Sequence, residues 1–230
     1  LELGAVNLNV SEGFDYIWGK SRKALKYCYD HHLSDYDWFL KADTDTYVIV
    51  ENLRYLLTLY DPEIPLALGM RAHRLGQGKD YLQGGAGYVI SREGVKRFVE
   101  KAFPRPEICR EYDWGQDEDM EMGRCLTNVG VVLGDSRDEF GRNRFFQHTP
   151  EDYITGKHIH WYPKILKYPD KKGLEALSDT SITFHTLKNE STLYAFEFFI
   201  YKLQVFGLNR AFSGSPKPSL PPDLTAVPDQ

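Results

Sequence analysis

The sharpest candidate for chemistry in this sequence is a pair of carboxylates, Asp43 and Asp45, that follows the apolar run at residues 38–42. Two acidic side chains two residues apart at the end of a strand can both point into one cleft, where their hard oxygen atoms suit Mg²⁺ or Mn²⁺. A cation held there would bridge a nucleotide diphosphate and stabilise its charge as it leaves. The alternative is a solvated acidic turn, because a bare Asp-x-Asp pattern often occurs by chance.

His185 is a second candidate for metal binding. It ends a predicted strand at residues 181–184, and a neutral imidazole is a good ligand for Mn²⁺. The alternative is a hydrogen-bonded histidine of the core. The other histidines have no spacing that supports a ligand role.

An acidic triplet at residues 117–119, Asp-Glu-Asp, opens a predicted helix. A helix N-terminus stabilises a carboxylate as its anion, which lowers the pKa of that carboxylate and keeps it ready to accept a proton near neutral pH. This pattern predicts a general base. Plain helix capping is the commoner use of acids at this position and is the alternative.

A glycine-rich run at residues 84–87 could line a binding cleft, since glycines let a ligand approach the backbone. It lacks the Lys and Ser/Thr of a P-loop, and the alternative is a tight connection between strands. Two further sequences, Asn9-Val10-Ser11 and Asn189-Glu190-Ser191, fit the N-glycosylation pattern and favour a secretory location.

The composition is that of a globular protein and gives no sign of a nucleic-acid-binding or membrane-spanning one. The formal charge is −5 over 230 residues, and the hydrophobic share of 42% is typical of a globular chain. No basic run indicates a nucleic-acid partner, and no apolar stretch is long enough to cross a bilayer. Cys109 and Cys125 flank a loop and could form one disulfide, whereas Cys28 lies on the apolar face of a predicted helix and is expected to be a buried thiol.

Strands that alternate with helices must position these groups. Apolar runs predict strands at residues 38–42, 47–50, 66–70, 88–90, 131–133 and 181–184, and helical spacing predicts helices at 20–33, 53–60, 92–102, 117–129 and 191–206. Ser91 is expected to cap the helix that follows it. Loops are expected at 71–80, 103–116 and 135–175. This order predicts an α/β sheet with covered faces, and the polar clusters fall at strand ends, where open α/β sheets bind ligands.

Taken together, these segments resemble the animal β-1,3-glycosyltransferases, which include fringe and the core 1 galactosyltransferases. The resemblance covers about residues 6–207 and is closest to the core 1 enzymes. Its motifs, in order, are Leu-Asn-Val-Ser-Glu-Gly at 8–13, Trp-Gly-Lys at 18–20, Trp-Phe-Leu-Lys-Ala-Asp-Thr-Asp-Thr-Tyr-Val at 38–48, Val-Glu-Asn-Leu-Arg-Tyr-Leu at 50–56, Gly-Gly-Ala-Gly-Tyr-Val at 84–89, Glu-Asp-Met-Glu-Met-Gly at 118–123, Gly-Asp-Ser-Arg-Asp at 134–138, Arg-Phe-Phe at 144–146, Ser-Asp at 178–179 and Ile-Thr-Phe-His at 182–185.

Residues 213–230 are rich in Ser and Pro, a composition that predicts a disordered tail. The resemblance implies a GT-A fold, with residues 1–212 as the C-terminal portion of the catalytic domain. The first residues of this stretch are typical of mid-domain sequence. The resemblance implies that two parts are missing from it, namely the first strands, which hold the uridine, and the membrane anchor. It also implies a role for each of several residues. These are Mn²⁺ binding by Asp43, Asp45 and His185; proton abstraction by Asp119; donor binding by Trp18, Lys20, Lys41 and Asp43; acceptor binding by Gly84, Gly85, Glu118, Trp161 and Tyr162; and a disulfide between Cys109 and Cys125.

The activity implied is inverting transfer of galactose from UDP-galactose to the 3-hydroxyl of GalNAc on Ser or Thr of glycoproteins, with Mn²⁺ as cofactor. The implied setting is the Golgi lumen, as a type II membrane protein and a homodimer. One alternative is a fringe-like β-1,3-GlcNAc-transferase or an enzyme for another acceptor. Another is a catalytically silent, chaperone-like relative, but such a relative lacks the Asp-x-Asp motif. A metal hydrolase lacks a second metal cluster and an activated nucleophile.

The sequence departs from the core 1 pattern at several positions. Thr44 stands where those enzymes usually have Asp, although the two outer carboxylates remain. Ala176 and Leu177 replace a pair of cysteines, and Thr186 replaces the Tyr that follows the metal-binding histidine. Because these changes fall on the acceptor side, the resemblance leaves the acceptor open.

Overall fold

The structure is a computed structural model that describes residues 4–73, 80–157 and 162–205. Within those residues, the largest sheet has four strands in the order β1-β6-β3-β7. Its strands are β1 (Trp38–Lys41), β3 (Leu66–Gly69), β6 (Tyr88–Ser91) and β7 (Val132–Leu133). Strand β6 runs antiparallel to both of its neighbours, whereas β3 and β7 run parallel. The predicted α/β class is confirmed, and the sheet is mixed.

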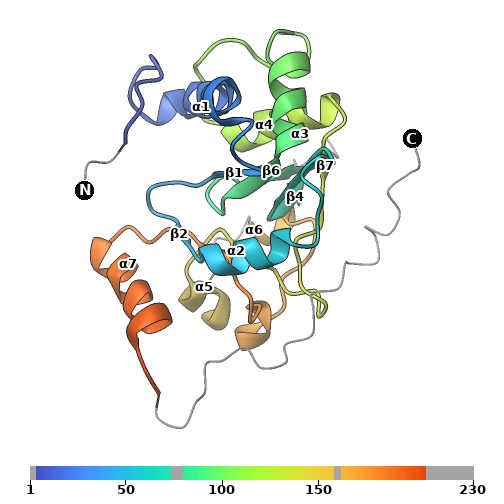
Figure 1. Cartoon of the computed structure of the whole chain (residues 1–230). Helices are drawn as coiled ribbons and strands as arrows, with labels where there is room; N and C mark the ends of the chain where they lie inside the picture. Colours follow the sequence, from blue (N-terminus) through green and yellow to red (C-terminus); the bar gives the residue numbers. More distant parts are fainter. Residues whose placement is uncertain (1–3, 74–79, 158–161, 206–230) are drawn as a thin grey trace.

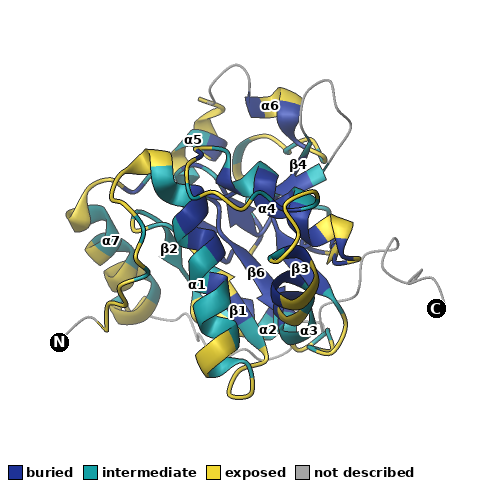
Figure 2. Ribbon diagram, turned by 90° about the horizontal axis from the view of Figure 1, so that it is seen from above, coloured by how far each residue is buried: buried dark blue, intermediate teal, exposed yellow. Residues whose placement is uncertain are grey.

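One face of this sheet is covered by helices that lie above it in Figure 1. They are α1 (Ile17–His32), α3 (Arg92–Arg97), the π-helix η2 (Phe98–Ala102) that continues it, and α4 (Glu118–Asn128). Leu25 of α1, Phe98 of η2 and Met122 of α4 pack with Phe39 and Ile90 of the sheet. Strands β3 and β6 are buried along their whole length (Figure 2), which explains why both are continuous apolar runs.

The other face packs against α2 (Val50–Leu57) and a smaller sheet. That sheet has the order β2-β9-β8, formed by β2 (Tyr47–Val48), β8 (Phe145–Phe146) and β9 (Thr183–Phe184). The rings of Phe146 and Phe184 stack with their centroids 5.0 Å apart. Strand β9 ends one residue before His185, so this second sheet positions one of the candidate metal ligands.

Short elements complete the described chain. They are η1 (Phe14–Tyr16), α5 (Pro150–Thr155), α6 (Tyr162–Ile165), η3 (Gly173–Ala176), α7 (Glu190–Glu197) and the π-helix η4 (Phe198–Lys202). The predicted loop at 135–175 therefore contains regular structure. Helix α5 forms there because Thr149 and Asp152 make a capping box and Pro150 occupies the first turn.

The prediction of a loop at residues 71–80 was also wrong in part. Strands β4 (Arg71–His73) and β5 (Asp80–Leu82) pair in an antiparallel ladder. Ala72 and Tyr81 are buried against Ile165 of α6, so tertiary contacts stabilise a pairing that is too short to give a clear alternating pattern. Elsewhere the predicted elements are found with shifted ends, as where Val50 begins α2 instead of ending β2.

Some predictions are not decided by this architecture. The predicted tail at residues 213–230 lies outside the described residues, and the GT-A type of the fold stays a prediction. Among the described helices, none is both long and apolar enough to span a membrane.

Ser91 caps α3 as expected and also ties three segments together. Its Oγ accepts the backbone N–H of Gly94 at 3.0 Å, which satisfies a donor at the start of the helix. The same oxygen accepts the N–H of Leu66 at 3.0 Å and donates to the carbonyl of Ile64 at 2.7 Å. Ser91 therefore fixes the entry of β3 against the end of β6 in a completely buried position.

Replacing Ser91 by Ala is expected to lower the free energy of unfolding by about 2–4 kcal/mol, because the helix loses its cap and the buried N–H of Leu66 loses its partner. Urea unfolding followed by circular dichroism measures this change. Ser34→Ala, at an exposed serine, is the matched control and should change stability by less than about 0.5 kcal/mol. Equal stability of the two variants would contradict the bonding role of Ser91.

Candidate active site

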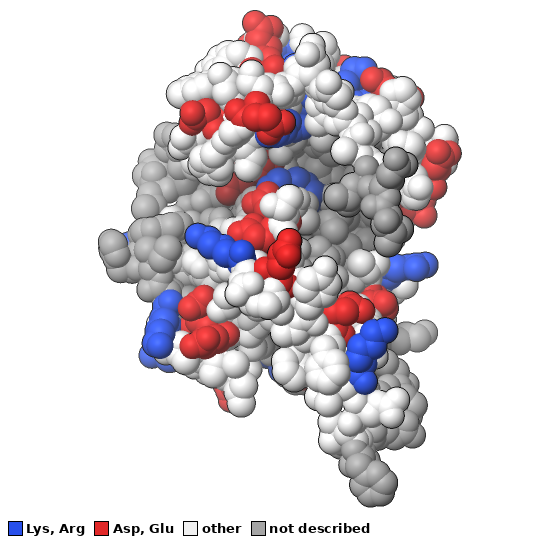
Figure 3. Space-filling view, turned by 90° about the vertical axis from the view of Figure 1, so that its left-hand side faces the viewer, with Lys and Arg blue, Asp and Glu red and all other residues white. Residues whose placement is uncertain are grey.

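Most of the predicted site residues that the structure describes line one open cleft of about 1050 Å³. Its walls come from α1, from β1 and the loop after it, from the glycines before β6, from the start of α4 and from the residue after β9. Figure 3 looks onto this side of the molecule and shows acidic side chains gathered across the hollow middle of the face, with basic side chains beside them. Segments far apart in the sequence therefore converge at one surface.

Asp43, Asp45 and His185 form a compact group at the end of β1. One ligand atom from each can be chosen so that all lie within 4.8 Å of one another. His185 Nε2 is 3.1 Å from Asp45 Oδ1 and 3.7 Å from Asp43 Oδ2. The three side chains are half-buried, and two carboxylates with one imidazole are a donor set that suits Mn²⁺. The residues present thus fit the divalent cation that the sequence predicts.

The loop that carries the two aspartates is held by its own backbone and by the neighbouring segments. The N–H of Thr46 donates to the carbonyl of Asp43 at 3.1 Å, which closes a turn. Thr46 Oγ1 donates to the carbonyl of Gly85 at 2.9 Å, and the N–H of Leu187 donates to the carbonyl of Asp45 at 3.1 Å. The turn after β1 is therefore fixed to both the glycine run and the His185 segment.

His185 is oriented by a residue that the sequence did not single out. Its Nδ1 is 3.0 Å from the carbonyl oxygen of Gln147, which can only accept, so Nδ1 carries the proton and Nε2 keeps its lone pair for a metal. The side chain of Gln147 accepts the N–H of Ala86 at 2.9 Å. No local pattern marked Gln147, because its role depends on the packing of β8 and β9 against the glycine run.

The residue after His185 has a strained backbone. Thr186 has a φ of 61°, in the left-handed region that β-branched residues rarely adopt. Such a conformation costs on the order of 1–3 kcal/mol and persists only where the surrounding structure fixes it. Here the next residue, Leu187, is buried and bonded to the Asp45 carbonyl. The strained turn keeps His185, the candidate metal ligand, against the acidic loop.

Lys41 connects the metal group to the start of α4. Its Nζ donates to Asp43 Oδ1 at 2.7 Å and to the carbonyl of Gly84 at 3.1 Å, and lies 3.6 Å from Glu118 Oε2. Burial alone would lower the pKa of Lys41, but the carboxylates of Glu118, Asp43 and Asp119 together raise it above its usual value. Lys41 is therefore a fixed cation among carboxylates.

Glu118 is held below the cleft by a second partner. The hydroxyl of Tyr88 donates to Glu118 Oε1 at 2.5 Å, and both side chains are buried, Glu118 with only 3% of its surface exposed. Burial and the Glu118 carboxylate raise the pKa of Tyr88 well above its usual range, so Tyr88 stays a donor. With Lys41 near its other oxygen, Glu118 has fixed partners on both sides.

Asp119 is fixed at the first turn of α4 and faces the same cleft. Its Oδ2 accepts the N–H of Gly84 at 3.1 Å and its Oδ1 accepts the N–H of Met120 at 2.8 Å. Burial and the neighbouring Glu118 carboxylate raise the pKa of Asp119 to about 6, against the opposing effect of those two bonds and of Lys41. The expectation of a lowered pKa was wrong, because burial outweighs the helix terminus. A carboxylate with this pKa is a stronger base and is still mostly anionic at pH 7.

The other residues that were predicted to contact the donor or the acceptor differ in where they lie. Lys20 lines the cleft and pairs with Glu12 at 2.6 Å. Trp18 lies in the core instead of the cleft, with 0% of its surface exposed, because its indole packs beneath the loop after η2 and donates to the carbonyl of Arg110. Tyr162 is likewise completely buried, with its hydroxyl 2.6 Å from that of Tyr153. Neither side chain lies where a sugar could reach it, and Trp161 falls outside the described residues.

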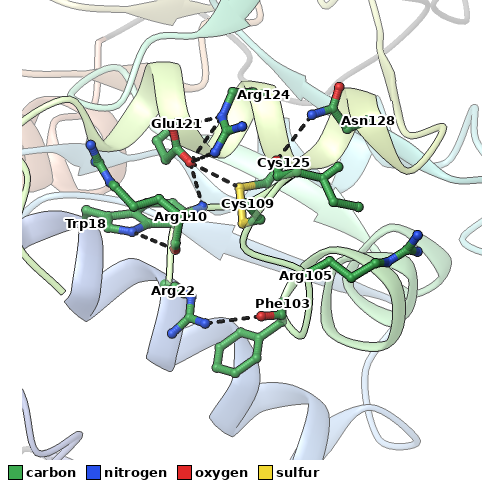
Figure 4. Close-up of a disulfide and its surroundings, with 12 residues drawn as sticks. Trp18, Arg22, Phe103, Arg105, Cys109, Arg110, Glu121, Arg124, Cys125 and Asn128 are labelled. Carbon is green, nitrogen blue, oxygen red and sulfur yellow. Dashed lines mark hydrogen bonds and ion pairs between the residues drawn. A yellow bond between two sulfur atoms is a disulfide. The ribbon is translucent and has the colours of Figure 1, made fainter. Parts of the chain in front are cut away.

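The disulfide between Cys109 and Cys125 is present and ties the loop after η2 to α4 (Figure 4). Beside it, Glu121 of α4 accepts the backbone N–H of Arg110 at 2.8 Å, and the Arg110 guanidinium is 2.6 Å from Asp117. Further along the same loop, the carbonyls of Asp113 and Gly115 accept N–H groups from the first turn of α1. This loop therefore fixes the start of α4, and with it Glu118 and Asp119, relative to α1. Cys28 is a free thiol, but it is half-buried and not buried as expected, because it lies at the edge of the core under α1.

An α/β domain that places two carboxylates, an imidazole and a further carboxylate of raised pKa in one cleft has the groups of a metal-assisted transferase. The family model described as Fringe-like matches residues 19–197, which is most of the chain. The chain belongs to this family of β-1,3-glycosyltransferases.

Individual relatives agree with this assignment. The chain is 38% identical over 208 residues, 88% of its length, to glycoprotein-N-acetylgalactosamine 3-beta-galactosyltransferase 1 of Xenopus laevis, and spans 56% of that protein. It is 31% identical over 169 residues to chondroitin sulfate synthase 3 of Mus musculus, covering 66% of this chain and 18% of that one. It is 32% identical over 151 residues to beta-1,3-glucosyltransferase of Mus musculus, covering 63% and 29%. The chain therefore spans about half, or less, of the length of these relatives.

Gly85 must be a glycine if the triad is to keep its geometry. A Cβ at this position would overlap the His185 ring and approach Gln147 Nε2 to 2.8 Å. We expect Gly85→Ala to displace the imidazole and to weaken Mn²⁺ binding at least about tenfold, or about 1.4 kcal/mol. Titration of Mn²⁺ by electron paramagnetic resonance measures this affinity. Gly4→Ala, where an added Cβ meets nothing within 4 Å, should bind as the parent does. Unchanged Mn²⁺ affinity in Gly85→Ala would show that His185 is not a ligand of the metal site.

Proposed function

We propose that this chain is the metal-binding and catalytic portion of an inverting, Mn²⁺-dependent galactosyltransferase. It transfers galactose from UDP-galactose to the 3-hydroxyl of GalNAc linked to Ser or Thr. The observation that carries the proposal is the shared cleft, in which Lys41 and the glycine run connect the triad of Asp43, Asp45 and His185 to the base candidate. The activity in the name of the Xenopus laevis relative, a galactosyltransferase acting on glycoprotein N-acetylgalactosamine, supports the choice of transferred sugar and acceptor. The proposed architecture is of the GT-A type.

Asp43, Asp45 and His185 would hold the cation. When bound, Mn²⁺ supplies positive charge that stabilises the UDP diphosphate as it leaves. Lys41 fixes one oxygen of Asp43, which leaves Oδ2 on the side of the His185 ring. Because Lys41 is already engaged by Asp43 and Gly84, its part in donor binding is to position these groups and to lower the negative charge of the cleft.

Asp119 takes the proton from the acceptor 3-hydroxyl. As that proton leaves, the hydroxyl oxygen forms a bond to the anomeric carbon on the face opposite UDP, and the bond from that carbon to UDP breaks, so that the α linkage becomes β. The bonds from Gly84 and Met120 hold both oxygens of Asp119 in place before the substrate arrives. Gly84 and Gly85 line the adjoining wall and would contact the acceptor sugar, whereas Glu118, buried and engaged by Tyr88 and Lys41, would support that wall from behind. Fixed positions of this kind supply a large share of enzymatic rate acceleration.

A second candidate is the same chemistry with another sugar or acceptor, as in a β-1,3-GlcNAc- or glucosyltransferase. It is favoured by the range of activities named among the relatives and by Thr44, which lines the cleft between the two metal-ligand aspartates. A panel of UDP-sugars tested against GalNAc-, fucose- and glucuronate-terminated acceptors separates the two candidates. The proposed setting is the Golgi lumen, with a glycoprotein acceptor and a homodimeric enzyme; the disulfide is typical of such a compartment.

The first expected result is that UDP binds only together with Mn²⁺. Isothermal titration of UDP into the chain with its N-terminal part restored should give a binding signal with Mn²⁺ and none after chelation, because the cation would supply the charge that binds the diphosphate. Asp45→Ala should abolish the signal, whereas Asp35→Ala, at an exposed aspartate, should keep it. Binding of UDP that survives both chelation and Asp45→Ala would contradict the proposed metal role.

The second expected result concerns the base. Asp119→Asn keeps the shape of the side chain but cannot accept the proton, so turnover should fall by roughly 10²–10⁴-fold while Mn²⁺-dependent UDP binding is retained. Because the pKa of Asp119 is raised to about 6, activity should be full above pH 7 and be lost as the pH falls through about 6. Product formation measured by chromatography between pH 5 and 8 tests both effects. Near-normal turnover in Asp119→Asn would show that another group is the base.

A further inference from the structure

The two Asn-x-Ser sequences, at Asn9 and Asn189, are not used by the chemistry of the cleft. The Cys109–Cys125 disulfide belongs to a class of bond that forms and persists in oxidising compartments. In the same compartments, oligosaccharides are added to Asn-x-Ser sequences on accessible segments. We propose that Asn189 carries an N-linked oligosaccharide. The proposal rests on the secretory setting of the proposed function, but not on transferase activity.

Asn189 is presented in a geometry that leaves its reactive atom available. It is exposed and is the N-cap residue of α7, with its Oδ1 accepting the N–H of Ser191 at 3.0 Å. The cap therefore uses only the amide oxygen. None of the described residues accepts a hydrogen bond from the amide nitrogen, Nδ2. The atom that would carry the sugar is thus one that no hydrogen bond occupies among the residues that the structure describes.

The chemistry of attachment keeps this cap. A bond forms between Asn189 Nδ2 and the anomeric carbon of the first sugar, and the bond from that carbon to the pyrophosphate of a lipid-linked oligosaccharide donor breaks. One amide proton is lost from Nδ2, and the carbonyl oxygen Oδ1 remains an acceptor. Asn189 can therefore cap α7 with the oligosaccharide attached, so the modified chain can keep the same backbone at this turn.

The neighbourhood of Asn189 has room for a large substituent. Lys188, Glu190 and Ser191 are exposed as well, so both sides of the attachment point face solvent. Asn189 does not line the active-site cleft, although His185 lies four residues before it. An oligosaccharide at the start of α7 therefore stands on open surface.

The second sequence is in a different position. Asn9 has a φ of 53°, its carbonyl accepts Lys23 Nζ at 3.1 Å, and its neighbour Leu8 lines the cleft. A sugar at Asn9 would stand at the rim of the active site, whereas one at Asn189 would not. The structure therefore distinguishes the two sequences, and Asn9 provides an internal comparison.

The test is to secrete the protein from animal cells behind a standard secretion signal and to map its peptides by mass spectrometry. Treatment with an amidase that removes N-linked oligosaccharides in heavy-oxygen water converts each occupied Asn to a labelled Asp. We expect most copies to be labelled at Asn189. Ser191→Ala keeps the Asn189 cap but breaks the acceptor sequence, and Asn189→Asp keeps an oxygen cap but removes the amide, so both should lose the label completely.

Two controls make the result decisive. Ser11→Ala, which breaks only the Asn9 sequence, should leave the Asn189 label unchanged. Formation of the Cys109–Cys125 disulfide, read from the same peptides, shows that the chain folded in the secretory compartment. Unlabelled Asn189 in protein that contains this disulfide would overturn the proposal. Because no step uses UDP-sugar turnover, this outcome is separate from failure of the transferase assignment.

Discussion

The ammonium group of Lys41, buried among carboxylates at the end of β1, is the interaction on which the site depends. A buried charge is costly unless it is paired, and breaking one side of such a pair typically costs about 3–5 kcal/mol. Here the partners come from separate segments, namely Asp43 after β1, the Gly84 carbonyl before β6 and Glu118 at the start of α4. Pairing the Lys41 ammonium requires that these three segments come together. Because they do, the candidate metal ligands lie beside the candidate base.

The acidic groups of the cleft differ in their environments, and the roles proposed for them follow from that difference. Asp43 and Asp45 stay half-exposed beside an imidazole, where they can give oxygen atoms to a cation. Asp119 is more enclosed, and burial with a neighbouring carboxylate raises its pKa to about 6. When the environment gives similar carboxylates different pKa values, one can bind a cation as an anion while another acts as a base in the same cleft.

Contacts outside the cleft hold its candidate residues in place. The Cys109–Cys125 bond and the adjacent loop hold the start of α4 against α1, so the position of the candidate base does not depend on helix packing alone. On the opposite wall, the Gln147 carbonyl fixes the tautomer of His185, and Gly85 leaves the space that the imidazole ring needs. The position of a metal ligand depends on the neighbouring groups that orient its side chain.

The sequence by itself determined the local features: the apolar strand that ends in Asp43 and Asp45, the cap at Ser91, and the acidic start of α4. These follow from residue patterns a few positions long, which set local backbone structure. The residues left a Cys109–Cys125 disulfide open as one option, and the family resemblance favoured it. Only the tertiary structure decided that Trp18 and Tyr162 belong to the core, that residues 71–82 hold a strand pair, that Gln147 orients His185, and that the pKa of Asp119 is raised. Burial and side-chain orientation arise from contacts between segments far apart in the chain, and no short pattern encodes those contacts.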